Sequence, residues 1–371
     1  MDPTKCTGTS SVASNLRSTA DAPVTGLARP LDLGRLASWL HAHVAGAEGE
    51  LAAQKFPGGQ SNPTYLLSID GNPRFVLRRK PDGLLLPSAH AVEREYRVTL
   101  ALKDTEVPVA CPLALCEDAG VVGTPFFIME YAAGRNFWDA RLPELMPAQR
   151  GAIYDEMNRV LAALHAIDPA SVDLADYGRP GNYFARQAAR WTQQYRATET
   201  QRIDAMERLI TWLPANDPGL DASRIVHGDF RNDNVIFAAH APRIVAVLDW
   251  ELSTLGHPLA DLAQHVMAWR VPSEGYRGLS DADLPSLGIP DEAEYLRLYG
   301  ARSGAGEIDP AHWRYALAFA MFRNAAIRQG VYRRALDGNA SSDAAALHGA
   351  RAGEIAGLAW RIASGEGGAR L

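Results

Sequence analysis

The stretch from residue 224 to residue 263 constrains this chain more than any other part of its sequence. Two short runs rich in β-branched residues, 235–237 and 244–247, are typical of strands joined by a polar turn. Asp229 and Asn234 precede the first run, and Asp249 follows the second. Three polar side chains are therefore expected at neighbouring strand ends. This layout is typical of a site for a divalent metal and phosphate groups.

The spacing of these three residues matches the needs of phosphoryl transfer. That reaction requires a carboxylate near the attacking hydroxyl, oxygen ligands for Mg²⁺, and cations on the phosphates. Asp229 is followed five residues later by Asn234, as in kinases, and Asp249 stands where a second Mg²⁺-binding aspartate is expected. With a reference pKa of about 3.9, Asp229 would orient the hydroxyl and accept its proton late. Asn234 and Asp249 are the predicted metal ligands.

The same residues resemble a known family. The segment from His227 to Asn234, His-Gly-Asp-Phe-Arg-Asn-Asp-Asn, and the Leu-Asp-Trp-Glu that ends at Glu251 resemble motifs of the aminoglycoside phosphotransferase and choline kinase-like superfamily. The continuation over 252–263 is similar to the phosphotransferase domains associated with acyl-CoA dehydrogenases. The resemblance runs from about Arg29 to the C-terminal helices.

The resemblance implies a fold and a reaction. The expected fold is α+β and protein-kinase-like, with a small N-terminal antiparallel β lobe that carries helices and a larger, mainly helical C-terminal lobe. The expected cofactors are ATP and Mg²⁺. The implied acceptor is the hydroxyl of a hydroxy acid or hydroxyacyl-CoA, with 4-hydroxyacyl substrates first. An aminoglycoside or other amino-alcohol acceptor, or a nucleotide-binding pseudokinase without activity, are the alternatives.

Three further residues of the stretch receive roles, that of Asp261 by the same resemblance. Asp261 is expected to brace the catalytic loop as a structural carboxylate, and His227 to stabilise that loop without acting as the base. Asp233 is predicted to cap a local turn. Glu251 receives no firm role.

Composition limits the class of protein. A chain of 371 residues with 47% hydrophobic content is long enough for about two globular domains. Its net charge of −6 argues against nucleic-acid binding. No apolar run approaches the ~20 residues that a membrane span needs, and residues 1–28 lack the apolar region of a secretory signal. We expect a cytoplasmic protein with a flexible leader over 1–28, a nucleotide-binding lobe over 29–130 and a catalytic lobe over 131–371. The sequence indicates no oligomeric state.

The expected phosphate contacts of the first lobe begin at a glycine pair. Gly58 and Gly59 would let backbone N–H groups approach phosphate oxygens, and Ser61 could add a hydroxyl, although a plain hairpin turn explains the segment equally well. The strand over 74–80 places Arg78 where kinases carry a lysine, and Arg can grip phosphate with two parallel hydrogen bonds. Lys80 is the alternative contact, and a solvated strand end is the alternative for Arg79 or Lys80.

A helix over 88–102 should carry the partner of Arg78. Ser88 is its expected N-cap, and the spacing of Val92, Tyr96 and Leu100 predicts its buried stripe. By analogy with the lysine–glutamate pair of kinases, Glu95 is the predicted carboxylate that orients Arg78, with Glu93 as its rival.

Later segments complete the prediction. Strands are expected over 107–116 and 125–131, and a turn at Gly71-Asn72 precedes them. The hinge over 131–134 follows, where backbone groups of Glu130 to Ala132 would contact adenine. The remaining prediction is of long helices: 148–167, 182–197, 311–337 and 342–364.

Two arginines of the second lobe bear on the acceptor. Arg186 and Arg190 lie on the helix predicted over 182–197, and an exposed position is favoured over a place in a substrate wall. If the acceptor is anionic, both become candidates for contact. An aminoglycoside would instead call for a carboxylate-lined pocket, which the second-lobe sequence does not indicate.

Overall fold

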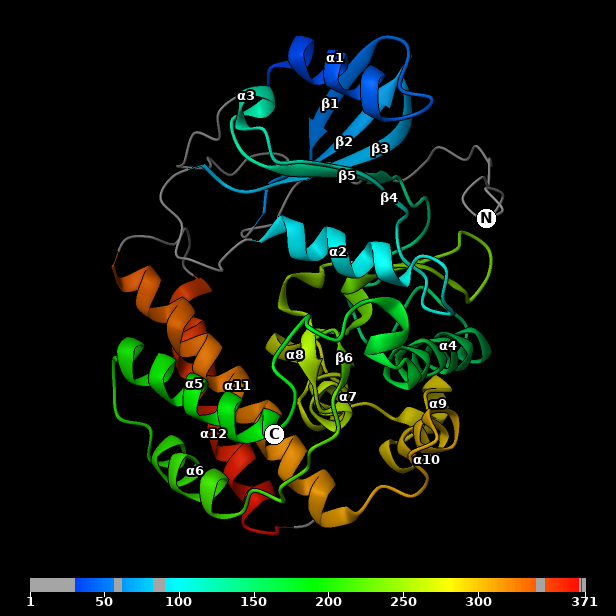
Figure 1. The fold of residues 1–371 in the computed structure, drawn as a ribbon. Coiled ribbons are helices and arrows are strands. Elements are labelled where there is room, and N and C mark those ends of the chain that lie inside the picture. Colours follow the sequence, from blue (N-terminus) through cyan, green and yellow to red (C-terminus); the bar gives the residue numbers. More distant parts are fainter. Residues whose placement is uncertain (1–30, 57–61, 83–90, 338–343, 367, 369–371) are drawn as a thin grey trace. The chain divides into compact units, whose positions relative to one another are not determined.

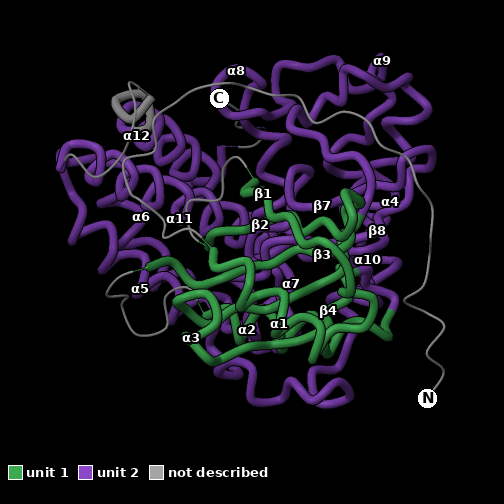
Figure 2. Tube along the Cα trace, turned by 90° about the horizontal axis from the view of Figure 1, so that it is seen from above, with its two compact units in different colours: residues 1–105, 109–132 green, residues 106–108, 133–371 purple. Residues whose placement is uncertain are grey.

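The computed structural model describes residues 31–56, 62–82, 91–337, 344–366 and 368. The predicted leader over 1–28, the phosphate-loop candidates Gly58, Gly59 and Ser61, and the N-cap candidate Ser88 lie outside these residues. The chain divides into two compact units, one of residues 1–105 with 109–132 and one of residues 106–108 with 133–371 (Figure 2).

The first unit is built on a five-stranded antiparallel sheet (Figure 1). Its strands stand in the order β1 (Leu51–Lys55), β2 (Thr64–Ile69), β3 (Asn72–Arg79), β5 (Phe126–Glu130) and β4 (Pro112–Cys116). The β2–β3 turn is formed by Asp70 and Gly71, both at positive φ, one residue earlier than the predicted Gly71-Asn72. An Asp-Gly pair is favoured there because a two-residue hairpin turn needs positive φ at both positions.

Three helices accompany this sheet: α1 (Leu33–His43), α2 (Val92–Leu102) and α3 (Ala119–Val122). Helix α1 buries Leu36 and Leu40 in a core shared with Leu67, Leu77 and Phe126. The apolar stripe of α1 thus covers the β-sheet, as its period of 3.6 residues requires.

The buried face of α2 differs from the prediction. Its buried residues are Val92, Glu95, Val98, Thr99 and Leu102. The predicted Tyr96 is only partly buried and Leu100 is 40% exposed. The helix is rotated because the carboxylate of Glu95, and not an aromatic ring, faces the interior of the unit.

The second unit is mainly helical (Figure 1). Its longer helices are α4 (Pro147–Ala166), α5 (Tyr183–Thr198), α6 (Asp204–Ala215), α7 (Pro258–Val266), α10 (Glu292–Ser303), α11 (Pro310–Leu336) and α12 (Ala344–Ala363). Helices α5, α6, α11 and α12 pack against one another, and α4 packs on α10. The segment between α7 and α10 holds the short helices α8 (Ser273–Tyr276) and α9 (Leu284–Leu287).

Two short antiparallel strand pairs lie within the second unit. β6 (Arg224–Val226) pairs with β9 (Thr254–Gly256), and β7 (Val235–Phe237) pairs with β8 (Ile244–Val247). Two 3₁₀ turns, η3 (Asn232–Asn234) and η4 (Trp250–Leu252), flank the second pair. In the part of the chain described here, no helix is both long and apolar enough to span a bilayer.

Candidate active site

Two side-chain amides hold the carboxylate of Asp229. The Asn234 Nδ2 donates to Asp229 Oδ2 at 3.0 Å and also to the Asp229 carbonyl at 2.8 Å. The Gln264 Nε2 donates to Asp229 Oδ1 at 3.3 Å. Because each carboxylate oxygen accepts one amide hydrogen bond, the orientation of the Asp229 side chain is defined on both sides.

Gln264 was not predicted from the sequence. It lies on α7, three residues after Asp261, so the two side chains project from one helix face. That spacing is the one signal in the sequence that could have identified it. Its contact with Asp229 joins residues 35 positions apart, which a motif search does not connect.

Asp261 anchors the loop that carries Asp229. Its buried carboxylate accepts hydrogen bonds from the backbone N–H of His227 at 2.6 Å and of Gly228 at 2.8 Å. The His165 Nε2 lies 3.2 Å from Asp261 Oδ2, while His165 Nδ1 lies 2.6 Å from the Tyr299 hydroxyl. Burial raises the pKa of Asp261, but the hydrogen bond and charge of His165 and the His227 N–H hold that pKa below its ordinary value.

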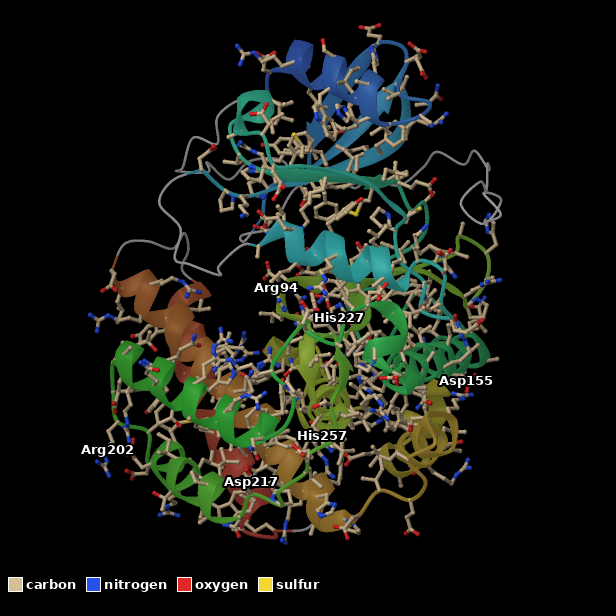
Figure 3. The ribbon with its side chains drawn as sticks, viewed as in Figure 1. Arg94, Asp155, Arg202, Asp217, His227 and His257 are labelled. Carbon is tan, nitrogen blue, oxygen red and sulfur yellow. The ribbon has the colours of Figure 1, made fainter. Side chains whose placement is uncertain are left out.

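His227 forms a second brace within the loop and is fully buried (Figure 3). Its Nδ1 accepts the backbone N–H of Asp229 at 3.2 Å, and its Nε2 lies 2.8 Å from the carbonyl of Leu248. Because a carbonyl only accepts and an N–H only donates, the proton of the ring is on Nε2. Both ring nitrogens are occupied in holding the chain between β6 and β8, so His227 is not placed to act as a base.

Gly228 is the residue that the loop geometry requires. Its φ is +85°, and a Cβ there would stand 2.8 Å from the carbonyl oxygen of Leu252. A side chain would therefore face both an unfavourable backbone conformation and a backbone clash.

We expect the substitution Asp261→Asn to destabilise the second unit. An amide has one acceptor oxygen for two backbone donors and would turn its NH₂ toward one of them, at a cost of about 2–3 kcal/mol in the free energy of unfolding. Because the folded-state pKa of Asp261 is depressed, its stabilisation is present above the unfolded-state pKa of about 3.9 and is lost as pH falls through the lower, folded-state value.

Urea unfolding of both proteins at pH 7 and at pH 3 to 4 measures this effect. The difference in the free energy of unfolding between wild type and variant should be largest at pH 7 and should become smaller at the acid pH values. An equal difference at every pH would contradict the role given to the ionised carboxylate.

Asp249 occupies a strained backbone position just after β8. Its φ of 63° and ψ of 58° place it in the left-handed region, which non-glycine residues adopt at a cost and often at functional sites. The N–H of Leu248 donates to the carbonyl of Asn234 at 2.8 Å, so the two predicted metal ligands lie on connected backbone.

The donor set of Asn234 and Asp249 is suited to Mg²⁺. Both hydrogen bonds of the Asn234 side chain to Asp229 are made by its nitrogen, which leaves its hard amide oxygen for a cation. Asp249 adds a carboxylate. The described residues contain no cluster of three or more His, Cys, Asp and Glu arranged for a metal. A Mg²⁺ that keeps waters and phosphate oxygens as ligands needs only one or two protein carboxylates.

Arg231 lies within the electrostatic reach of both predicted catalytic carboxylates. Burial lowers the pKa of Arg231, but its hydrogen bond to Asp233 and the charges of Asp229, Asp233 and Asp249 raise that pKa above its ordinary value. Asp233 was predicted to cap a turn, and this was wrong. Its carboxylate binds the guanidinium groups of Arg231 and, at 3.3 Å, Arg277.

Asn136 holds the opposite side of the loop and was also missed. Its Nδ2 donates to the carbonyls of Asp233 at 2.8 Å and Val235 at 3.0 Å. The residue lies about a hundred positions before its partners, so no local pattern marks it.

In the first unit, Arg78 contacts Glu95. The Arg78 Nε lies 2.8 Å from a Glu95 carboxylate oxygen, and both side chains are largely buried. Asn62, which the sequence did not single out, donates from Nδ2 to the other oxygen of Glu95 at 2.8 Å. Glu93 pairs instead with Lys80. The ion pair expected between Arg78 and Glu95 is thus present, and its role toward phosphate remains a prediction.

Two other expectations for the first unit change. A solvated strand end was the alternative for Arg79, but its side chain is fully buried, forms an ion pair with Asp82 and donates to the Val122 carbonyl at 3.1 Å. The N–H of Glu130, a predicted adenine contact, already donates to the carbonyl of Cys111 at 2.9 Å. The Glu130 N–H is therefore engaged within the unit, while contacts to adenine by the Glu130 carbonyl and by Ala132 stay predictions.

The two arginines of α5 have different surroundings. Arg186 donates from Nη2 to the carbonyl of Arg179 at 2.6 Å and so holds the turn before the helix. Arg190 is exposed and lies over the ring of Trp191, 6.0 Å from its centroid.

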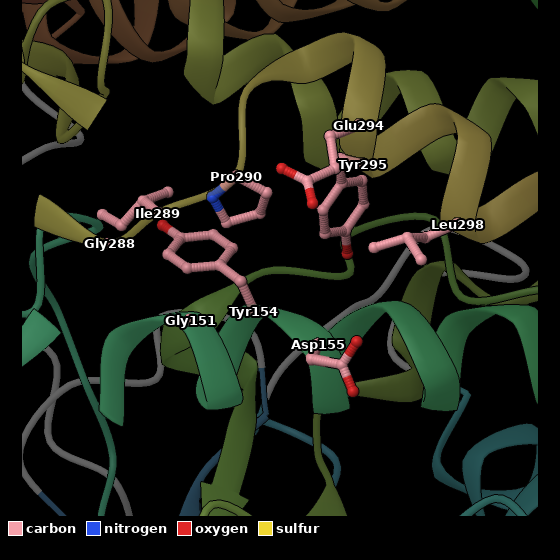
Figure 4. A pocket seen from close by; sticks show the side chains of 9 residues that line it. All are labelled: Gly151, Tyr154, Asp155, Gly288, Ile289, Pro290, Glu294, Tyr295 and Leu298. Atoms are coloured by element: carbon pink, nitrogen blue, oxygen red, sulfur yellow. The ribbon is translucent and has the colours of Figure 1, made fainter. Parts of the chain in front are cut away.

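A pocket of about 320 Å³ opens between α4 and α10 (Figure 4). Tyr154, Asp155, Glu294 and Tyr295 are among the side chains that line it. None of the predicted site residues contributes to its wall. The predicted site around Asp229 therefore lies outside this pocket.

Comparison with known proteins assigns the family. Residues 52–299 match the model of the phosphotransferase enzyme family. The chain belongs to this family. The phosphotransferase is 48% identical over 321 residues to acyl-CoA dehydrogenase family member 10 of Mus musculus. The alignment covers 86% of this chain and 30% of that protein. It is 42% identical to acyl-CoA dehydrogenase family member 11 of Mus musculus, and that alignment covers 84% of this chain and 41% of the relative. The chain thus spans well under half the length of these relatives.

Solved structures give the fold independently. A protein of Ralstonia eutropha assigned to the aminoglycoside phosphotransferases superposes with a TM-score of 0.82 at 48% identity, over 90% of this chain and 99% of that one. A thermostable mutant of aminoglycoside phosphotransferase APH(4)-Ia gives a TM-score of 0.58 at 16% identity, over 85% of this chain and 96% of that one. The predicted superfamily and kinase-like fold are confirmed, and the chain is a kinase-type phosphotransferase.

Proposed function

We propose that this phosphotransferase uses ATP and Mg²⁺ to phosphorylate a hydroxyl of a hydroxy acid or hydroxyacyl-CoA, with 4-hydroxyacyl compounds as the preferred acceptors. The observation that carries the proposal is the carboxylate of Asp229, fixed by the amides of Asn234 and Gln264. A carboxylate held in this way is preorganised to orient a hydroxyl for attack.

The residues divide the work of the reaction between them. Asp229 aligns the acceptor hydroxyl and takes its proton as the new oxygen–phosphorus bond forms and ADP leaves. Asn234 and Asp249 would hold Mg²⁺, which neutralises charge on the phosphates when bound. Arg78, oriented by Glu95, would contact phosphate oxygens of the nucleotide. In the distant fold neighbours, nucleotide complexes exist, such as spectinomycin phosphotransferase APH(9)-Ia with ADP and spectinomycin.

Two observations favour an acyl-CoA acceptor over an aminoglycoside. The curated relatives carry acyl-CoA dehydrogenase names, and this chain aligns with a part of each of them. The second-lobe sequence also indicates no carboxylate-lined pocket of the kind that an aminoglycoside calls for. A pseudokinase is disfavoured because Asp229, Asn234 and Asp249 are all retained.

An acceptor panel tests the proposal. Release of ADP from Mg·ATP would be measured with a 4-hydroxyacyl-CoA, the matching free 4-hydroxy acid, the acyl-CoA that lacks the hydroxyl, and an aminoglycoside. We expect the 4-hydroxyacyl-CoA to raise turnover at least 100-fold over the rate without acceptor, with a phosphoester detected by mass spectrometry. The acyl-CoA without the hydroxyl is the matched control and should not be phosphorylated. Turnover that no hydroxylated acceptor stimulates would contradict the proposal.

A further inference from the structure

Tyr276 lies between two arginines in the second unit. The Arg328 guanidinium of α11 is 5.1 Å from the centroid of its ring, and the Arg351 guanidinium of α12 is 5.3 Å from it. The Tyr276 hydroxyl donates to Glu354. Gly275 makes room for this arrangement, because a Cβ there would stand 2.1 Å from Arg351 Nη2. Two like charges are thus gathered around one aromatic ring.

The stacking leaves the donors of both arginines available. A guanidinium that lies over a ring uses its flat face and keeps the N–H groups of its edge for other partners. Arg328 uses one of these N–H groups, because its Nε donates to Asn324 Oδ1 at 2.8 Å. Within the part of the chain that the structure describes, no carboxylate forms an ion pair with Arg328 or Arg351. Arg196 and Arg302 of the same unit each pair with an acidic residue.

Arg328 and Arg351 lie within electrostatic reach of the loop that carries Asp229. Burial lowers the pKa of Arg328, and the positive charges of Arg351 and Arg231 lower that pKa further, while the charges of the neighbouring Tyr276 and Glu354 offset this in part. The charges of Asp229 and Asp249 in turn raise the pKa of Arg231. Nitrogen-tipped side chains gather beside α11 in Figure 3.

Acidic residues balance this positive charge incompletely. Arg231 and Arg277 share the single carboxylate of Asp233, and Glu354 is engaged by the Tyr276 hydroxyl. Partly buried like charges are costly unless a counter-charge is bound. A bound anion would supply the counter-charge that the described residues leave incomplete.

We propose that Arg328 and Arg351 bind a phosphate or diphosphate group carried by the acceptor. This inference rests on the proposed function and adds the recognition element for the end of the acceptor remote from its hydroxyl. A phosphate group offers several acceptor oxygens to the two guanidinium edges and removes the repulsion between them. The cluster lies wholly in the unit that carries Asp229, so the same unit both holds the acceptor and receives its proton.

Calorimetric titration of the full chain tests the inference without turnover. The probes are coenzyme A and inorganic pyrophosphate, each titrated with Mg·ADP present at saturation, and Mg·ADP titrated alone. The variants Arg328→Leu and Arg351→Leu keep the aliphatic bulk that packs on Tyr276, and Arg334→Leu removes an exposed arginine of the same helix as the control. We expect each cluster variant to bind coenzyme A at least tenfold more weakly, as loss of a charged hydrogen bond predicts, and the control to bind as wild type does.

The outcomes separate the possible sources of the anion. If the two variants weaken Mg·ADP binding and leave coenzyme A unaffected, the arginines serve the nucleotide and the inference is overturned. Unchanged binding of both probes in both variants overturns it as well. A thermal unfolding curve for each protein shows whether a variant has a folding defect. The conservative variant Arg328→Lys should retain part of the affinity for coenzyme A.

The proposed function can fail separately. If coenzyme A binds and the variants weaken it, but no hydroxyacyl-CoA stimulates turnover, the anion site stands and the acceptor assignment falls. If a hydroxyacyl-CoA stimulates turnover and its KM is the same in wild type and both variants, the acceptor assignment stands and the anion site falls.

Discussion

Replacing Asp229 by asparagine should lower kcat for the acceptor by about 10²–10⁴-fold, the range that a positioned proton acceptor contributes. The expected loss has two causes in the structure. The carboxylate that takes the proton is gone, and the new NH₂ would face either the Asn234 or the Gln264 amide donor, so the side chain would turn away from its place. Affinity for Mg·ADP should stay close to that of wild type, because Asp229 is not a predicted metal ligand.

Steady-state kinetics of Asp229→Asn with saturating Mg·ATP, together with calorimetric binding of Mg·ADP, measure both quantities. The variant Asp204→Asn is a suitable control, since Asp204 is an exposed residue at the start of α6. A variant at position 229 that keeps more than a tenth of wild-type kcat would remove Asp229 from its proposed role.

Replacing Asp249 should weaken binding of the Mg²⁺ complex of the nucleotide. We expect Asp249→Asn to raise the KM for Mg·ATP at least tenfold and to lower kcat at least 100-fold, because one anionic ligand of a doubly charged cation is lost. Asparagine is the informative substitution. It tolerates the left-handed backbone conformation at this position (φ 63°), whereas Asp249→Ala adds a backbone penalty of about 1–2 kcal/mol.

Asp173 supplies the matched control for this experiment. It is another aspartate in the left-handed region, with φ 56°, and it ends the 3₁₀ turn Pro169–Val172 of the second unit. Asp173→Asn should leave both kinetic constants unchanged. If raising the Mg²⁺ concentration restores none of the activity of Asp249→Asn, and its affinity for Mg·ADP equals that of wild type, Asp249 is not a metal ligand.

Local patterns predicted the frame of the candidate site. The order of His227, Asp229, Asn234 and Asp249 is contained in one stretch of chain, and the short strand pair β7–β8 holds its ends together. The contact between Arg78 and Glu95 was also predicted, because the strand–helix order of the kinase pattern brings a strand residue opposite a helix residue. These predictions depend on spacing along the chain, which the sequence displays directly.

Predictions that depended on burial were less secure. Helical spacing suggested Tyr96 and Leu100 as part of the inner face of α2, and a solvated strand end was the alternative for Arg79. In the structure the partners of charged groups decide burial: Glu95 turns inward to meet Arg78, and Asp82 pairs with the buried Arg79. A buried charge is tolerated only where a partner is supplied, and hydropathy does not show the partner.

The sequence by itself thus determined the family and the kinase-like fold, and it singled out Asp229 as the proposed reacting carboxylate, because each depends on short-range order. Only the tertiary structure showed that Gln264 and Asn136 hold the catalytic loop, and that Arg328 and Arg351 enclose Tyr276. These contacts join residues on separate helices and loops. Their energy depends on distances that arise when the chain has folded, and no local pattern in the sequence carries that information.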